Sequence, residues 1–285
     1  RKLRGLIDDM CDNRPFIKWG EEHGVDIANS PAFTGGSGCF LFNPGRGNTF
    51  LVDTTGQGNY QTVRLSAKDL GYPDLKRAYY ALNLYLAHQF SDKWFGRIDY
   101  TFSRSYGNSE GQLNSDIGQQ DVSVTQAWDF PELMEGSNGP LPNDRKHQIK
   151  AYGYYQPNEE WLISGVARIY SGAPISCFGT RPAGDPFGYT NAYFYCNGEL
   201  SPRGTSGRTP WIYQLDASVQ YRPNWAGRQL AFSLDAFNLL GKQRAQNVYE
   251  YGETGSGAPD QDFKRAISTQ SPRYFRFGVR YDFTL

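Results

Sequence analysis

Four cysteines and three histidines are the side chains of this chain best suited to covalent or metal chemistry. Cys11 and Cys39 lie in one long stretch between apolar segments, and Cys177 and Cys196 lie in another. The even number and the pairwise placement predict two disulfides, Cys11–Cys39 and Cys177–Cys196, formed in an oxidising compartment. Zinc is the alternative, but it would need four ligands drawn from two distant stretches without any close Cys-x-x-Cys pair.

Catalytic chemistry has no clear pattern in the sequence. The histidines His23, His88 and His147 are isolated, and no Gly-x-Ser-x-Gly motif occurs. The stretch from Asp53 to Asn59 has the glycine spacing of a calcium-binding loop, but it lacks the carboxylates at the third and fifth positions, which favours a simple turn. We therefore expect no catalytic residue, no metal site and no cofactor.

The elements that carry these residues are indicated by hydrophobic alternation. In the last thirteen residues, Phe275, Phe277, Val279, Tyr281, Phe283 and Leu285 alternate with Arg276, Gly278, Arg280, Asp282 and Thr284. Strict alternation predicts a β-strand with one apolar face and one polar face. Charges opposite six large apolar groups favour a strand between lipid and a polar lumen, whereas a strand of a soluble sandwich is the alternative.

About eight segments share this pattern, and the weakest, Arg1–Asp9, is expected to be the upper end of a strand cut by the chain start. The predicted lipid-facing residues are Leu82, Leu84, Ile98, Tyr100, Leu215, Val219, Phe232, Leu234, Phe275, Phe277, Val279, Tyr281 and Phe283. The predicted lumen-facing residues are Arg97, Asp99, Lys150, Asp216, Gln220, Asp235, Arg276, Arg280 and Asp282. There the charged groups are expected to pair, because unpaired charges away from water are costly.

The connections between these segments alternate in length. Ser91–Lys93, Pro157–Glu160 and Pro223–Gly227 are tight turns, whereas the long connections run roughly over 10–73, 108–143, 172–208 and 241–271. Compact soluble domains rarely contain four loops of that size. The asymmetry is typical of outer-membrane barrels, with short periplasmic turns and long extracellular loops. We expect the long loops to contain at most short helical turns and little core of their own.

Composition is consistent with a transmembrane barrel. No run of about twenty apolar residues exists, so no transmembrane helix is predicted, whereas barrel strands carry only a half-apolar signal. Aromatic residues make up 15% of the chain, and several lie near predicted strand ends, where girdles form. These are Tyr79, Tyr80, Phe90, Trp94, Trp161, Trp211, Tyr221 and Tyr281. Cross-strand pairing in a soluble sheet is the alternative. The formal net charge is zero and gives no argument for nucleic-acid binding.

Two long loops contain candidate ligand-binding residues. Between Ser105 and Asn143 there is no lysine, arginine or histidine, but there are six carboxylates: Glu110, Asp116, Asp121, Asp129, Glu132 and Glu135. They could attract a cationic substrate, or divalent ions bridging to lipopolysaccharide, or they could form a solvated surface. The next long loop holds Phe178, Phe187, Tyr189, Tyr193, Phe194 and Tyr195, which could contact a ligand or pack the loop.

Two stretches near the end of the chain resemble a known family. Ser233–Lys242 is a strand that ends in an Asn-Leu-Leu-Gly-Lys corner, and it precedes the strand Pro272–Phe283. The pair resembles the last two strands of a TonB-dependent outer-membrane receptor. The sequence from end to end is similar to the Oar-like branch of that family, through the stretches Asn43–Phe50, Tyr100–Asn108, Pro140–Arg145 and Ser201–Gly204.

The resemblance implies an all-β fold, a transmembrane antiparallel barrel of twenty-two strands around an N-terminal plug that carries a TonB box. Residues 1–285 are then expected to be about the last eight strands, with the plug and the TonB box outside this chain, which opens in mid-pattern. Leu285 stands where the family often has phenylalanine, but it keeps the parity of the strand.

The implied function is energy-dependent passage of a substrate that the sequence does not identify. The implied partners are TonB, through the missing N-terminal part, the barrel-assembly machinery, through the last strand, and the lipid and lipopolysaccharide of a Gram-negative outer membrane. An enzyme and a nucleic-acid partner are not expected. The alternative is a structural or adhesion barrel that transports nothing.

Overall fold

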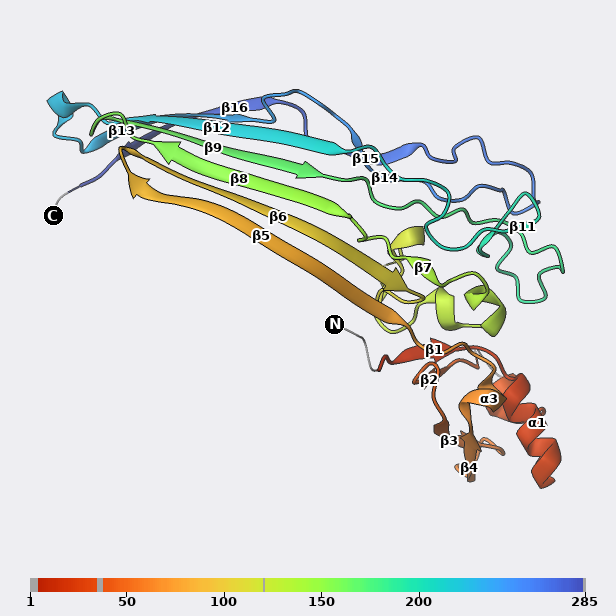
Figure 1. Ribbon diagram of the computed structural model, residues 1–285. Coiled ribbons are helices and arrows are strands. Elements are labelled where there is room, and N and C mark those ends of the chain that lie inside the picture. Colours follow the sequence, from red (N-terminus) through yellow and green to blue (C-terminus); the bar gives the residue numbers. More distant parts are fainter. Residues whose placement is uncertain (1–4, 35–37, 120, 284–285) are drawn as a thin grey trace.

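The computed structural model describes residues 5–34, 38–119 and 121–283, and its largest element is one long antiparallel sheet (Figure 1). Strands adjacent in the sheet are also consecutive long strands in the sequence, so the sheet is a meander. The long strands are β5 (Arg77–Ser91), β6 (Trp94–Gly107), β8 (His147–Tyr155), β9 (Trp161–Tyr170), β12 (Ile212–Tyr221), β13 (Leu230–Phe237) and β16 (Tyr274–Tyr281). The two-residue strand β7 (Gly139–Pro140) pairs with the end of β6. The predicted all-β fold with about eight antiparallel strands is confirmed.

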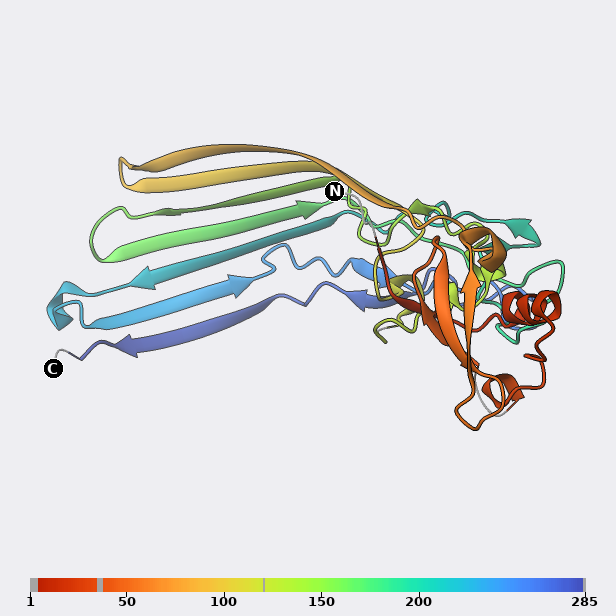
Figure 2. The same ribbon diagram turned by 90° about the horizontal axis from the view of Figure 1, so that it is seen from below.

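The two ends of the sheet differ, as the loop lengths predict. At one end the strands are joined by tight turns, and at the other end the long connections gather into a single mass, which we call the loop cap (Figures 1 and 2). The turn between β5 and β6 places Asp92 and Lys93 at φ 48° and 71°. Two consecutive residues with positive φ are typical of the two-residue hairpin turn that matches strand twist.

Strand pairing sorts the side chains onto two faces, because directly opposed residues project to the same side. Leu84 lies opposite Tyr100, and Tyr100 lies opposite Ile149. Toward the opposite edge of the sheet, Val219 lies opposite Leu234, and Leu234 lies opposite Phe277. All predicted lipid-facing residues of the paired strands therefore share one face, which we call the apolar face. Among the paired strands of the described chain, its only Lys, Arg, Asp or Glu is Arg104, near the end of β6.

The opposite face, the polar face, carries all predicted lumen-facing residues of the paired strands. Several of its arginines pair with aspartates, either across neighbouring strands or two residues apart along the chain. Arg276 lies 2.9 Å from Asp235, and Asp235 also accepts a hydrogen bond of 2.6 Å from Ser218. Arg168 lies 3.0 Å from Asp216. The expected pairing of charges on this face is thus present, while Lys150 lies opposite both Asp99 and Arg168 in the register.

The loop cap contains further secondary structure. Its first part, before β5, holds the helices α1 (Arg14–His23), α2 (Pro31–Thr34) and α3 (Ala67–Leu70) and the strand pairs β1 (Asp8–Met10) with β2 (Phe40–Phe42) and β3 (Asn48–Asp53) with β4 (Tyr60–Leu65). Later loops add η1 (Ser115–Ile117), η2 (Gln126–Trp128), η3 (Pro131–Met134), β10 (Tyr195–Cys196), β11 (Glu199–Leu200), β14 (Ala245–Val248) and β15 (Ala266–Thr269). The turn between β12 and β13 holds η4 (Asn224–Ala226). None of the described helices is long and apolar enough to cross a membrane.

The first part of the cap has a hydrophobic core of its own. Phe16 of α1 is fully buried, and its ring centroid lies 4.9 Å from that of Phe50 and 4.8 Å from that of Phe40. The long loop between β6 and β8 contributes Trp128 and Met134 to the same core. This core joins two loops that are far apart in the sequence, so the cap is a packed body and not a set of separate loops.

The expectations for this region were therefore partly wrong. The long loops do not contain only short turns, because α1 has ten residues. Nor does the segment Arg1–Asp9 extend the main sheet: Asp8–Met10 pairs with β2 inside the cap, and residues 1–4 lie outside the described chain. The apolar residues of the first loop pack against one another, which gives the segment a globular core in place of an extended strand.

Candidate functional site in the loop cap

Two disulfides crosslink the cap, with the predicted partners. Cys11 is bonded to Cys39, 28 residues away, and Cys177 is bonded to Cys196, 19 residues away. Cys11 also ties the first loop to the second, because its amide donates to the carbonyl oxygen of Asp129 at 2.9 Å. Closing loops of this length stabilises a fold by roughly 3–4 kcal/mol each in the chain-entropy account.

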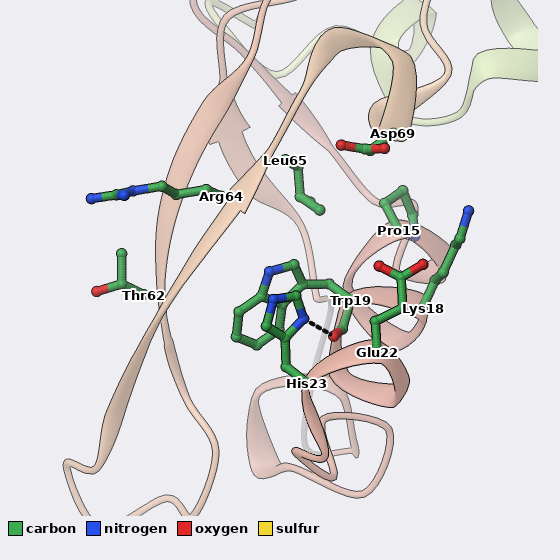
Figure 3. Close-up of a pocket in the computed structure, with 9 residues that line it drawn as sticks. All are labelled: Pro15, Lys18, Trp19, Glu22, His23, Thr62, Arg64, Leu65 and Asp69. Atoms are coloured by element: carbon green, nitrogen blue, oxygen red, sulfur yellow. Dashed lines mark hydrogen bonds between the residues drawn. The ribbon is translucent and has the colours of Figure 1, made fainter.

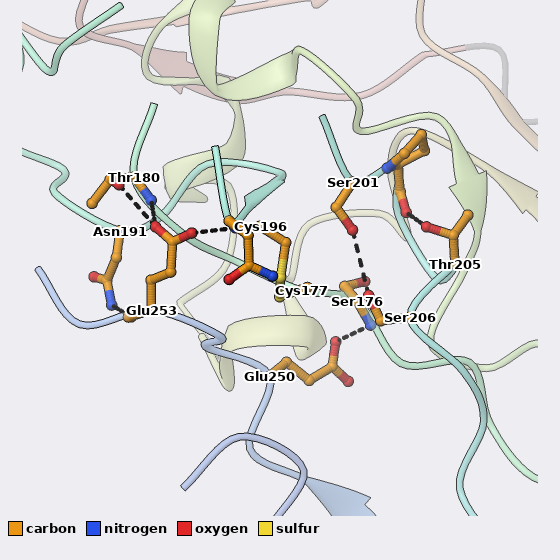
Figure 4. Close-up of a disulfide and its surroundings, with 12 residues drawn as sticks. Ser176, Cys177, Thr180, Asn191, Cys196, Ser201, Thr205, Ser206, Glu250 and Glu253 are labelled. Atoms are coloured by element: carbon orange, nitrogen blue, oxygen red, sulfur yellow. Dashed lines mark hydrogen bonds between the residues drawn. A yellow bond between two sulfur atoms is a disulfide. The ribbon is translucent and has the colours of Figure 1, made fainter. Parts of the chain in front are cut away.

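The second disulfide lies directly against the backbone of the last long loop (Figure 4). A Cβ on Gly252 would overlap the Sγ atom of Cys177 and lie 3.0 Å from the Sγ atom of Cys196. The amide of Gly252 donates to the carbonyl oxygen of Phe178 at 2.8 Å, and the amide of Phe178 donates to that of Glu250 at 3.0 Å. Only glycine fits between the disulfide and these backbone bonds.

Glu253 fixes both ends of the same crosslinked loop. Its side chain is buried, and its carboxylate accepts hydrogen bonds of 2.8 Å from both the amide and the hydroxyl of Thr180. The other carboxylate oxygen accepts a bond from the amide of Asn197. Glu253 therefore acts as a buried clamp that holds the residues following Cys177 and Cys196 against the last long loop.

A cavity of about 670 Å³, the loop chamber, opens between three long loops. Ser115 and Asp116 line it from the second loop, and Pro174 lines it from the third. The fourth loop contributes a continuous run, Gln246–Tyr251, and Ile267. A chamber of this size with a few polar groups is typical of a small-ligand site.

A buried ion pair borders the loop chamber. Asp116 and Arg203 lie 2.8 Å apart, and their side chains are 3% and 2% exposed. The ring of Phe194 lies 5.1 Å from the Arg203 guanidinium. Glu250 accepts a hydrogen bond of 2.8 Å from the amide of Ser176. Burial, reinforced by the charge of Asp116, raises the pKa of Glu250 to about 8.

The six carboxylates of the second loop do not form a free acidic surface, which corrects one interpretation of the sequence. Glu132 forms a bidentate pair with Arg14, with distances of 2.7 and 2.9 Å, and Asp129 accepts a bond of 2.5 Å from the Tyr189 hydroxyl. Glu135 lies 3.4 Å from Arg181, and Glu110 accepts a bond of 2.8 Å from the Ser115 hydroxyl. Asp116 is buried with Arg203. Asp121 and Glu135 are exposed, so these two positions match solvated acidic groups.

The aromatic residues of the third loop mostly pack the cap. Phe178, Tyr193 and Phe194 are buried, and the rings of Phe178 and Phe194 lie 4.7 Å apart. Phe187 stacks on Phe130 at 3.9 Å. Tyr189 is half-buried on Asp129, and Tyr195 belongs to β10. Buried rings cannot contact a ligand without opening the loop, so Tyr193 and Phe194 are unsuited to direct binding.

The structure also contains a second cavity, a groove of about 620 Å³ between α1 and β4 (Figure 3). Trp19 and His23 of α1 lie inside it, with their rings stacked 4.2 Å apart. Sequence reasoning missed this groove because α1 itself was missed. The spacing of Phe16, Gly20 and Val25, with Pro15 at the helix start and Gly24 just after its end, was the available signal.

No protein-family model matches the chain. The TonB-dependent transporter Oar of Myxococcus xanthus is 30% identical in an alignment of 279 residues that covers 83% of this chain and 24% of that protein. The chain thus spans about a quarter of the length of this curated relative.

Solved structures give weaker matches. The outer-membrane transporter YddB of Escherichia coli matches with a TM-score of 0.47 and 12% identity, over 86% of this chain and 29% of that one. The closed form of the ferric-catecholate import receptor Fiu of E. coli K12 matches with a TM-score of 0.42 and 14% identity, over 85% of this chain and 24% of that one. The ferripyoverdine receptor of Pseudomonas aeruginosa matches with a TM-score of 0.42 and 12% identity, over 85% of this chain and 24% of that one.

The antiparallel meander, with tight turns at one end and a large loop cap at the other, is the arrangement that is typical of outer-membrane barrels. The similarity to Oar then identifies the family: the chain is a homologue of part of a TonB-dependent transporter. Transporters of this family are outer-membrane proteins, and the resemblance of the sequence to TonB-dependent receptors is confirmed.

We expect the substitution Gly252→Ala to separate the last long loop from the Cys177–Cys196 disulfide, because the added methyl group overlaps a sulfur atom. Free thiols at Cys177 and Cys196 should increase, and amide exchange over 250–254 should accelerate, while Cys11–Cys39 stays intact. Peptide mapping without reduction measures both pairings. Gly255→Ala, in the same loop and with ordinary contacts at 3.4 Å, is the matched control. Complete Cys177–Cys196 linkage with unchanged exchange in Gly252→Ala would contradict this account.

Burial raises the pKa values of five carboxyls of the cap, which are Asp8, Asp9, Asp116, Asp129 and Glu250. Burial raises the pKa of Asp8 to about 6, against the opposing hydrogen bonds from Thr125. Burial also raises the pKa of Asp129 to about 7, against the opposing bond from Tyr189, and Glu250 titrates at about 8. Above its ordinary pKa an unfolded carboxyl has lost its proton, whereas each of these folded carboxyls keeps it. The folded cap therefore binds more protons than the unfolded cap, and its stability falls as the pH rises from the ordinary carboxyl pKa of about 4 to about 8.

We expect the cap to be more stable against local unfolding at pH 5 than at pH 8. The carboxyls with lowered pKa, such as Asp53 and Asp185, lose their contribution only at more acidic pH, so they do not oppose this trend. Amide exchange of the cap, corrected for intrinsic rates, is the measurement. Asp129→Asn should flatten part of the pH dependence, whereas Asp121→Asn, at an exposed site in the same loop, should not. A cap that becomes more stable from pH 5 to pH 8 would refute the assignment.

Proposed function

We propose that residues 1–285 form the C-terminal part of the barrel of a TonB-dependent outer-membrane receptor, with the apolar face toward lipid. The observation that carries the proposal is the near-absence of charge from that face of the paired strands. Large side chains on this face are exposed in the described chain: Leu86 by 72% and Phe277 by 67%. Contiguous apolar surface of this extent is unfavourable in water, and lipid is the solvent that suits it.

The polar face then lines the lumen. Several of its arginines pair with aspartates, as Arg276 does with Asp235, so the lining is charged and its carboxylates are neutralised by arginines. Such a lining suits the passage of hydrated solutes. It also suits contact with a plug, which in this proposal lies in a part of the receptor outside residues 1–285.

Aromatic side chains support the position of the bilayer. Near the tight turns, the Trp94 and His88 rings stack at 3.7 Å, and those of Trp161 and Tyr221 at 4.5 Å. Near the cap, the rings of His147 and Trp211 stack with their centroids 5.9 Å apart. Two aromatic bands at the two ends of an apolar face are typical of membrane barrels. The tight turns would lie in the periplasm and the loop cap outside the cell.

The proposed activity is TonB-coupled, energy-dependent passage of a substrate into or out of the lumen. In this proposal the chain supplies barrel wall and extracellular selecting loops, TonB acts on the N-terminal part, the barrel-assembly machinery recognises the last strand, and lipopolysaccharide surrounds the outer rim. The homology to a transporter argues against an enzyme. We assign the selecting role to the loop chamber, because most carboxylates of the second loop are bonded within the cap.

A structural or adhesion barrel is the second candidate. It is favoured by the cap, whose separate core and two disulfides resemble a displayed module more than a flexible gate. Dependence of uptake on the loop chamber would distinguish the two, because an adhesion barrel needs no path through its loops.

We expect Leu234→Arg to destabilise the membrane-inserted receptor by roughly 2–4 kcal/mol if the position lies near the bilayer midplane. Ser233→Arg is the matched control, because residue 233 is the neighbour on the polar face. Heat-modifiability and urea unfolding of the full-length receptor in lipid measure the difference. Equal stability of the two variants would argue against lipid on the apolar face.

Narrowing the loop chamber should slow passage without affecting barrel assembly. Ile267→Trp places a bulkier side chain at the chamber wall, at a position that is 62% exposed. Val122→Trp, 60% exposed and outside the chamber, is the control. Uptake in cells whose growth depends on the full-length receptor should fall several-fold for the first variant only. Normal uptake in Ile267→Trp, with assembly intact, would remove the chamber from the path.

A further inference from the structure

The groove between α1 and β4 has the form of a slot beside a strand edge (Figure 3). One wall is a face of α1 that includes Pro15, Trp19 and His23. The other wall is β4, through Thr62 and Arg64. The strand has a partner on one side only, since β4 pairs with β3 and with no other strand of the described chain.

The free edge of β4 presents unused backbone groups to the groove. Thr54 donates to the carbonyl oxygen of Asn59 at 3.2 Å, which sets the alternation of the hairpin. In an antiparallel pair, every second residue bonds to the partner strand and those between point away from it. The backbone N–H and C=O groups of Gln61 and Val63 therefore point to β3. Those of Thr62 and Arg64 point away from β3 and into the groove. Within the described chain, no hydrogen bond joins these groups to α1.

An aromatic platform faces this edge. The indole of Trp19 and the imidazole of His23 are nearly parallel, at an interplanar angle of 12°. Nδ1 of His23 donates to the carbonyl oxygen of Trp19 at 2.8 Å, which fixes the orientation of the imidazole. Lys18 and Glu22 lie on the same wall and contribute one charge of each sign. The groove thus offers an apolar surface and a polar rim without strong net charge.

Both walls are rigidly supported, so the groove is preformed. Phe16 holds α1 on the cap core through its contact with Phe50 of β3. Directly after β4 in the sequence, Ser66 and Asp69 form a reciprocal capping box at the start of α3. A preformed groove is a favourable binding site, because little conformational entropy is lost when a ligand enters.

We propose that this groove binds an extended peptide segment of a partner protein, which adds to β4 as a further strand. The occupant is a peptide because the free N–H and C=O groups alternate along β4 with the spacing of an extended backbone. A large apolar side chain of the peptide would lie on the Trp19–His23 platform. This binding site is independent of the proposed transport function, since it uses neither the loop chamber nor the polar face.

The test uses the full-length receptor in lipid nanodiscs and a panel of labelled, end-blocked heptapeptides. The peptides alternate threonine and valine, and their central residue is phenylalanine, tryptophan, leucine or lysine. Fluorescence anisotropy should show binding that is tightest with an aromatic centre. Amide exchange should show that bound peptide protects Thr62 and Arg64. A peptide with N-methyl groups on alternate residues should bind at least about tenfold more weakly, because it cannot donate to the edge.

Two prolines at directly opposed positions give a matched pair of variants. Thr62→Pro removes an N–H that points into the groove, whereas Leu51→Pro removes one on the other edge of the hairpin, at the residue opposite Thr62. Thr62→Pro should weaken peptide binding by at least about tenfold, and Leu51→Pro should leave it unchanged. Trp19→Ala should reduce the preference for an aromatic centre. Exchange of Val63 and Val52, both buried in the cap core, confirms folding of each variant.

Four outcomes would overturn the proposal. The first is that no peptide of the panel binds the parent receptor at roughly 1 mM. The second is that Thr62→Pro or N-methylation leaves binding unchanged, which would exclude strand addition. The third is that soluble oligosaccharides bind at Trp19 with equal affinity in Thr62→Pro, which would assign the platform to a sugar. The fourth is that β4 is protected by concentration-dependent dimerisation without peptide, which would make a second copy the occupant.

Discussion

The structure depends on a constraint of strand pairing: opposed residues must share a face. Each long strand alternates apolar and polar residues, and the register keeps those alternations in phase across the whole meander, from Leu84 and Tyr100 to Leu234 and Phe277. A slip of one residue in any strand would move charges onto the apolar face and leave them unpaired. The ion pairs of the polar face, such as Arg168 with Asp216, add to this specification because they form only in the observed register.

The cap is stabilised by different interactions from those of the sheet. Its connections are too long to be held by the turns of the sheet, and they gain order from packing, disulfides and buried polar bonds. The core around Phe16 draws Trp128 from a separate loop, and the Cys177–Cys196 disulfide lies against Gly252 of another. Glu253 and Arg203 are buried and bonded between loops. Most carboxylates of the second loop therefore hold the loops together, and this is why they do not form a free acidic surface.

The difference between local strand patterns and long-range cap contacts explains what the sequence could predict. Alternation with period two is a local signal, so the long strands, their faces and the tight turns were predictable, and so was cysteine pairing within each loop. The partners of the loop carboxylates were not, because Arg14 lies 118 residues from Glu132 and Arg181 lies 46 residues from Glu135. Helix α1 left a local signal, but its apolar residues are few, and they read as part of a long connection until their contacts with Phe40 and Phe50 are known.

Free strand edges have opposite consequences at the two ends of the molecule. In the described chain, β5 and β16 each pair on one side only, and under the proposed function both edges lie in lipid. Unsatisfied backbone groups are not tolerated there, so those edges require further strands of the barrel. The edge of β4 lies in the cap, where water can satisfy the same groups, so it stays stable while open. Only an edge in water is stable both with and without a bound partner. This is why β4, rather than the longer strands, is suited to recognition.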